Sequence, residues 1–128
     1  MFSIKTHFEQ EHINVEKLNA GKVAQMVVDV NVKKKGDYIM LEVPIPAGCS
    51  YDDKKQPYSN FEVHREYFKE KVSIFCESLL VGNYKFTIDL QPRFTGSYHL
   101  NPCTAELMYF PIFSGRNEMK KINIIENK

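Results

Sequence analysis

The sequence has no tryptophan, only three cysteines and no long apolar run, and each absence excludes a class of protein. A membrane-spanning helix needs about 20 consecutive apolar residues, and no segment approaches that length. Residues 1–5 also lack the apolar core of a signal peptide. We therefore expect no direct membrane insertion. The chain is then either a cytosolic protein or a sequence that begins inside a longer exported one.

The cysteines are too few and too widely spaced for a zinc site or a disulfide scaffold. Cys49, Cys76 and Cys103 are odd in number, and none belongs to a C-x-x-C pair. We predict free thiols that are buried or half-buried, with one disulfide and one leftover thiol as the alternative. A nucleophilic cysteine needs a base nearby, and no histidine or aspartate stands at a known spacing. No catalytic residue is predicted.

Charge of either sign is not in excess, since 17 basic residues face 16 acidic ones for a net charge of +1. Nothing therefore directs the chain toward nucleic acid. The three lysines at 33–35 are predicted to be a solvated strand end. No glycine motif for nucleotides is present, and Asp52 and Asp53 supply too few oxygens in pattern for calcium. We predict no cofactor, no metal site and no enzymatic activity.

What the chain does have is a period of two in its apolar residues, which is typical of half-buried strands. In residues 24–32 and 84–90 one side of the alternation is apolar and the other mostly polar. The nine phenylalanines and seven tyrosines are expected on apolar faces, in the core. This pattern predicts one immunoglobulin-like antiparallel β-sandwich over residues 1–128. About seven strands are expected, near residues 2–4, 24–32, 38–45, 71–79, 84–90, 96–100 and 121–125.

Two stretches do not follow the alternation. Residues 50–60 are polar and are predicted to be an exposed loop. Residues 102–111, with the sequence PCTAELMYFP, are apolar but bounded by prolines. They are predicted to form either a short helical turn or an irregular strand.

Three blocks of the sequence resemble the last macroglobulin-like domain of bacterial alpha-2-macroglobulins. They are YIMLEVPIPAG at 38–48, VHREYFKEKVSIFCESLLVGNYKF at 63–86 and GSYHLNPCTAELMYFP at 96–111. One departure is the charged edge segment, which usually reads Arg-Asp-Asp in relatives and is Phe68-Lys69-Glu70 here. The third block is the most specific, because six of its residues fall in the family's register: Pro102, Ala105, Glu106, Met108, Tyr109 and Pro111.

The resemblance implies a macroglobulin-like domain that is a fragment of a much larger chain. It implies a non-catalytic module of a protease inhibitor, exported to the periplasm and in some cases lipid-anchored through the parent chain. Its partners would be other domains of the parent, especially a thioester domain, whereas target proteases would be met through the parent. Because no Cys-Gly-Glu-Gln element occurs here, this chain would shield such a thioester and would not carry it.

The candidate interdomain contact lies in the third block and consists of Glu106, Met108, Tyr109 and Phe110. Flanking prolines reduce the entropy lost when a segment docks, and methionine and tyrosine are enriched in interfaces. The alternative is structural: Met108 and Tyr109 would plug the end of the sandwich's own core.

Two other functions remain open at this stage. An exported adhesion or carbohydrate-binding module would expose a stripe of aromatic residues, for which Tyr51 and Tyr58 are the candidates. A small enzyme on a sandwich would need a convergent polar cluster, which the sequence does not reveal. Fold alone decides neither.

Overall fold

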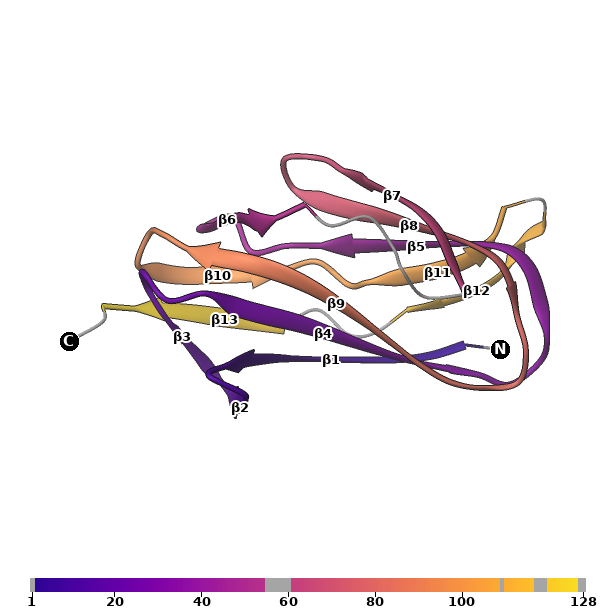
Figure 1. Cartoon of the computed structure of the whole chain (residues 1–128), viewed down its shortest axis with the longest axis horizontal. Helices are drawn as coiled ribbons and strands as arrows, with labels where there is room; N and C mark the ends of the chain where they lie inside the picture. Colours follow the sequence, from indigo (N-terminus) through magenta and orange to yellow (C-terminus); the bar gives the residue numbers. More distant parts are fainter. Residues whose placement is uncertain (1, 55–60, 109, 117–119, 127–128) are drawn as a thin grey trace.

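Two five-stranded sheets lie face to face in the computed structural model of the chain, and a three-stranded sheet lies toward one end (Figure 1). The structure describes residues 2–54, 61–108, 110–116 and 120–126, without side chains for 110–116. The first sheet runs β2 (Ile13–Val15), β1 (Phe2–Gln10), β4 (Ala24–Val32), β9 (Gly82–Pro92) and β6 (Cys49–Asp53). The second runs β12 (Phe110–Arg116), β11 (Thr104–Leu107), β5 (Gly36–Pro44), β8 (Lys71–Leu79) and β7 (Glu62–Tyr67). The small sheet runs β10 (Gly96–Leu100), β13 (Lys120–Ile125) and β3 (Lys17–Asn19).

The predicted all-β sandwich is confirmed, but the strands are more numerous than the expected seven. The described part of the chain contains thirteen. Several are too short to show alternation, such as β2 and β3 with three residues each and β11 with four.

The prediction of an exposed loop over 50–60 was wrong for its first residues. Cys49–Asp53 forms β6, which pairs with β9 through Tyr51 and Leu90. Its polar composition fits an edge strand, where side chains meet water. Residues 55–60 lie outside the described part of the chain. For residues 102–111 the irregular-strand alternative is confirmed, since β11 and β12 pair with a register shift between Glu106 and Leu107.

The core lies between the two large sheets, where their apolar faces meet. Side chains alternate across a strand, so a period of two places every second residue inside. Each fully buried leucine, isoleucine or valine stabilises the fold by about 1.5–3 kcal/mol. Most of the largest buried side chains come from these two sheets: Met26, Val28 and Val30 on β4, Phe86, Ile88 and Leu90 on β9, Ile39 and Leu41 on β5, and Ile74 and Leu79 on β8. The small sheet adds Leu18 on β3 and Ile124 on β13.

One charged side chain crosses between the two large sheets. Arg65 on β7 is buried, and its Nη1 donates to the backbone oxygen of Thr87 on β9 at 2.8 Å. Its Nε and Nη2 donate to the two carboxylate oxygens of the buried Glu62, at 2.6 and 3.1 Å. Burial acts to lower the pKa of Arg65, but hydrogen bonds to Glu62 and Tyr67 outweigh it and hold that pKa above its usual value. Arg65 therefore stays charged and ties the edge of the second sheet to the first.

A glycine at the end of the first resemblance block receives an aromatic ring from the third. The ring of Tyr98 packs so closely on Gly48 that a Cβ added to this glycine would lie 2.6 Å from the Tyr98 Cζ. The Tyr98 hydroxyl donates to the oxygen of Phe94 at 2.8 Å, and the amides of Arg93 and Phe94 donate to the Gly48 oxygen. Two distant parts of the sequence thus share one packed corner.

Candidate functional site on one outer sheet face

Parts of all three resemblance blocks meet on one sheet. The first block contains most of β5, the second contains β8 and most of β7, and the third contains β11. These strands are neighbours in the order β11-β5-β8-β7. Segments up to about 70 residues apart thereby form one continuous surface. The second block also reaches into β9, and the third contains β10, which belong to the other two sheets.

We call the solvent side of this sheet the Met40 face. Residues that pair directly across strands lie on the same side, which fixes its rows. The central row has the half-buried Met40 and Phe75 in its middle, whereas the next row is polar. The central row is Glu106, Met40, Phe75 and His64, and the polar row is Thr104, Glu42, Ser73 and Glu66.

An apolar cup of about 190 Å³ opens on the Met40 face. Tyr38, Val63 and Met108 line it and are 48%, 58% and 44% exposed. Phe75 also lines the cup, with its ring stacked on His64 at a centroid distance of 6.0 Å. Large apolar side chains gathered at one exposed site are typical of an interaction surface.

Two of the four predicted contact residues, Glu106 and Met108, lie at one end of this face. Glu106 is half-buried and pairs with Met40. Met108 follows β11 in the turn, and its backbone N–H donates to the oxygen of Tyr38 at 2.8 Å. Its exposure shows that Met108 does not plug the core. Tyr109 and the side chain of Phe110 lie outside the described part of the structure.

The expectation that the aromatic residues occupy the core was wrong for several of them. Tyr38, Phe68 and Phe94 are 45–66% exposed, and Phe75 is only half-buried. For Phe75 a signal was present in the sequence. It alternates with the buried Ile74 and Cys76, so the period of two already placed it on the outer side.

Tyr51, a candidate for an exposed aromatic stripe, packs inside the edge of the sandwich instead. Its hydroxyl donates to the backbone oxygens of Phe68 and, at 2.8 Å, of Lys71, in the turn between β7 and β8. Its ring meets the ring of Tyr67 edge to face at 5.1 Å. Burial, with a smaller contribution from Tyr67, raises the pKa of Tyr51 to about 12. Tyr58 lies outside the described residues.

The prediction of free thiols is confirmed. Cys76 and Cys103 are buried and Cys49 is half-buried. Burial raises the pKa of each thiol to about 12, so each is neutral at physiological pH. A neutral, covered thiol is a poor nucleophile, since the thiolate is the reactive form.

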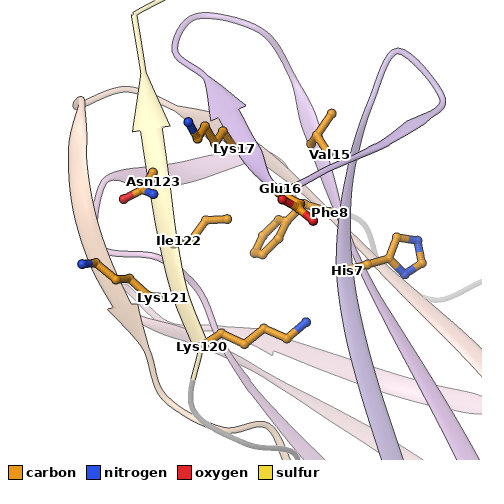
Figure 2. Close-up of a pocket in the computed structure, with 9 residues that line it drawn as sticks. All are labelled: His7, Phe8, Val15, Glu16, Lys17, Lys120, Lys121, Ile122 and Asn123. Atoms are coloured by element: carbon orange, nitrogen blue, oxygen red, sulfur yellow. The ribbon is translucent and has the colours of Figure 1, made fainter.

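A second hollow, of about 400 Å³, lies in the seam between β1 and β13 (Figure 2). Phe8 and Ile122 point into it, and both are buried core residues. Lys120 extends across the seam toward β1 and donates to the backbone oxygen of Thr6. Of the three lysines that line the hollow, Lys120 therefore has its amine already engaged in joining two strands.

Neither a cluster of potential metal ligands nor a helix able to span a membrane occurs among the described residues. Within it, no three histidine, cysteine, aspartate or glutamate side chains gather closely enough to hold a metal ion. Among the same residues, no helix has the length and hydropathy that a membrane crossing requires.

Several known structures with a similar fold are those of bacterial alpha-2-macroglobulins. A mutant of Salmonella alpha-2-macroglobulin superposes with a TM-score of 0.82 at 11% identity, over 96% of this chain and 9% of that one. Native Escherichia coli alpha-2-macroglobulin, from domain MG7 to the C-terminus, gives 0.80 at 11% identity, over 96% of this chain and 23% of that one. This chain thus spans a small part of the proteins it matches.

A different protein shares the general architecture. A cohesin module from a Clostridium perfringens family 33 glycoside hydrolase gives a TM-score of 0.59 at 12% identity, covering 97% of this chain and 98% of that one. At such identities, the structural likeness shows the fold alone. Among curated proteins, none matches the chain significantly.

The family model for the bacterial alpha-2-macroglobulin MG10 domain matches residues 2–111. That match includes β1 to β11 and all three convergent blocks. The chain therefore belongs to the bacterial alpha-2-macroglobulin MG10 domain family.

Proposed function

We propose that this chain is a non-catalytic module of a larger, exported alpha-2-macroglobulin-like protease inhibitor. It packs against neighbouring domains of the same parent chain through the Met40 face and the turn after β11. Where the parent carries a thioester domain, the module shields the reactive bond from water. The parent is periplasmic, with any lipid anchor elsewhere in its chain, and meets target proteases through its other domains.

One observation carries the proposal: the three family blocks build a sheet whose outer side exposes apolar residues. Tyr38, Val63 and Met108 stay uncovered, although their neighbours fill a well-packed core. A contact with another domain would remove this apolar surface from water, at about 25 cal/mol per Å². Interfaces are enriched in the aromatic residues and methionine that gather here.

Hydrogen exchange tests the packing. Backbone amides of β11 and of the turn at Met108 are compared between the 128-residue chain alone and the longer protein that contains it. We expect slower exchange at these amides in the longer protein, because the neighbouring domain covers them. Amides of β2, at the other sheet, serve as the control. Equal exchange in both samples at β11 and Met108 would contradict the proposal.

A Tyr109→Ala variant separates the two interpretations of the third block. As a contact residue, Tyr109 can be truncated with little loss of stability in the isolated chain. As a plug of the core, its removal would cost roughly 3–5 kcal/mol of unfolding free energy. Urea unfolding of the isolated variant measures the difference, and the larger loss would remove Tyr109 from the proposed contact.

The DNA upstream of the coding sequence decides how far the function extends. A long open reading frame with a Cys-Gly-Glu-Gln element supports the shielding role. A long frame without that element would leave the packing role and remove the shielding. A stop codon directly upstream would make this a free-standing domain and overturn the proposal.

The adhesion or carbohydrate-binding alternative has weaker support. It needs an exposed aromatic stripe, and Tyr51 instead turns its hydroxyl to the β7–β8 turn and its ring to Tyr67.

A further inference from the structure

The cup on the Met40 face has a fixed shape. Tyr38 has a positive φ of 55°. Among the described strands, it is the one non-glycine residue with such a backbone conformation. Such backbone is uncommon outside glycine and clusters at functional sites. The Tyr38 oxygen accepts the amide of Met108, so one hydrogen bond joins the strands that carry two walls of the cup.

The edge of the cup is acidic. Glu77 lines the cup itself and is exposed, and Glu106 stands next to Met40 in the central row. Glu66 is also exposed, beside His64. Glu42 is paired with Lys71 at 3.2 Å. Over these rows and the cup, the described side chains include four carboxylates, and Lys71 pairs with one of them. Arg116 on β12 pairs with Thr104 and extends the polar row, so acidic residues outnumber basic ones here but are not alone.

The charge of this face differs from that of the whole chain, which is nearly balanced at +1. An apolar centre bordered mainly by carboxylates selects its partner in two ways. The apolar part provides the free energy of burial, and the charges steer the partner and fix its orientation. A partner surface with acidic groups would be repelled.

We propose that the occupant of the cup is an apolar side chain flanked by lysine or arginine residues on a neighbouring protein domain. The apolar side chain enters between Tyr38, Val63 and Met108, above Phe75. The flanking cations lie against Glu77 and Glu106. This inference rests on the proposed packing function and adds the chemistry of the partner surface.

A short peptide serves as the first probe, because it does not depend on the parent protein. The ¹⁵N-labelled chain is titrated with the peptide Lys-Lys-Phe-Lys-Lys in low salt and observed by NMR. We expect shift changes centred on Tyr38, Phe75 and Met108. The peptides Glu-Glu-Phe-Glu-Glu and Lys-Lys-Gly-Lys-Lys should produce much smaller changes, since one reverses the charge and the other lacks the apolar side chain.

Charge reversal sharpens the test. The variant with Glu77→Lys and Glu106→Lys should bind the first peptide about tenfold more weakly, as should the native chain in 0.5 M salt. Glu16→Lys is the control, because Glu16 is exposed, as Glu77 is, and lies between β2 and β3, away from this face. Shifts at other surfaces, or equal binding of the acidic peptide, would overturn the inference.

The longer protein separates failure of this inference from failure of the packing function. Suppose that the amides of Met108 and β11 are protected from exchange in the longer protein, and that neither the two charge reversals nor salt changes this protection. The packing function then stands and the inference fails. If protection is lost in the charge-reversed variant but kept with Glu16→Lys, both stand. If no protection exists in the native longer protein, the packing function fails whatever the peptide does.

Discussion

The two outer faces of the sandwich differ in what their side chains contact: one has paired polar groups, and the other has exposed apolar side chains. On the first sheet, which we call the Asp29 face, Asp29 stands between Lys5 and Lys85, and Asn31 donates to Asn83 at 2.6 Å. On the Met40 face, the central row holds Met40 and Phe75 beside an apolar cup. One face finds its polar partners within its own sheet, whereas the other leaves apolar surface uncovered. The two faces belong to different sheets, so the chain can satisfy the polar groups of one and leave apolar side chains exposed on the other.

The largest expected effect comes from the contact that joins the sheets carrying these faces. Arg65→Met removes the cation from a buried ion pair and leaves the Glu62 carboxylate without it. We expect a loss of about 3–5 kcal/mol in the free energy of unfolding, measured in urea. Replacing Glu62 by Leu in the same variant should restore part of this loss. A loss below about 1 kcal/mol in the single variant would contradict the role of Arg65.

Next in size is a contrast between two adjacent residues of β8. Ile74 points into the core and Phe75 onto the Met40 face, so Ile74→Ala should cost about 2–5 kcal/mol. Phe75→Ala should cost only about 1 kcal/mol in the isolated chain, because its ring is half-exposed. Denaturant unfolding of both variants measures the contrast. Equal losses would show that the Met40 face belongs to the core.

A smaller effect is expected on the Asp29 face. Asp29→Lys places three like charges in a row across β1, β4 and β9, with Lys5 and Lys85 directly opposite. The repulsion should lower stability by about 0.5–1 kcal/mol in low salt and by less at 0.5 M salt. Asp29→Asn is the control, since it removes the attraction without adding repulsion. No dependence on salt would argue against cross-strand pairing on this face.

The smallest expected effect at neutral pH is that of the three thiols on the free energy of unfolding. This effect becomes large only above pH 9. Burial raises the pKa of Cys49, Cys76 and Cys103 from 9.0 to about 12. Unfolded thiols ionise above pH 9 while folded ones keep their protons, so the native state binds more protons and stability falls as pH rises. We expect the unfolding free energy, measured with reductant, to drop between pH 9 and 10. Cys76→Ala should reduce that slope, and an unchanged slope would exclude the contribution of Cys76.

Much of the fold was predictable because alternation is a local property. The apolar residues of 24–32 and 39–45 identify strands and their inner faces, and both sets are buried as expected. Strand β6 was missed because its polar sequence follows from its place at a sheet edge. Gln10 was missed for a different reason. It is buried, with its amide held by the backbone of Asn19 and Lys22, and these partners lie on another part of the chain.

The candidate site was predictable in part. The proline-bounded block identified Glu106 and Met108, and the alternation along β8 already turned Phe75 outward. Nothing in the sequence placed Tyr38 and Val63 beside them, since that depends on the strand order β11-β5-β8-β7.

The sequence by itself determined the longer alternating strands and their inward faces, and its blocks indicated the family, because each of these is encoded in neighbouring residues. The tertiary structure alone decided which outward residues meet. Strand pairing brings Tyr38, Val63, Phe75 and Met108 to one cup and carries Arg65 across to the Thr87 oxygen. The physical reason is that contacts across a sheet join residues far apart in the chain, and the register that aligns them is set by the burial of the whole inner face.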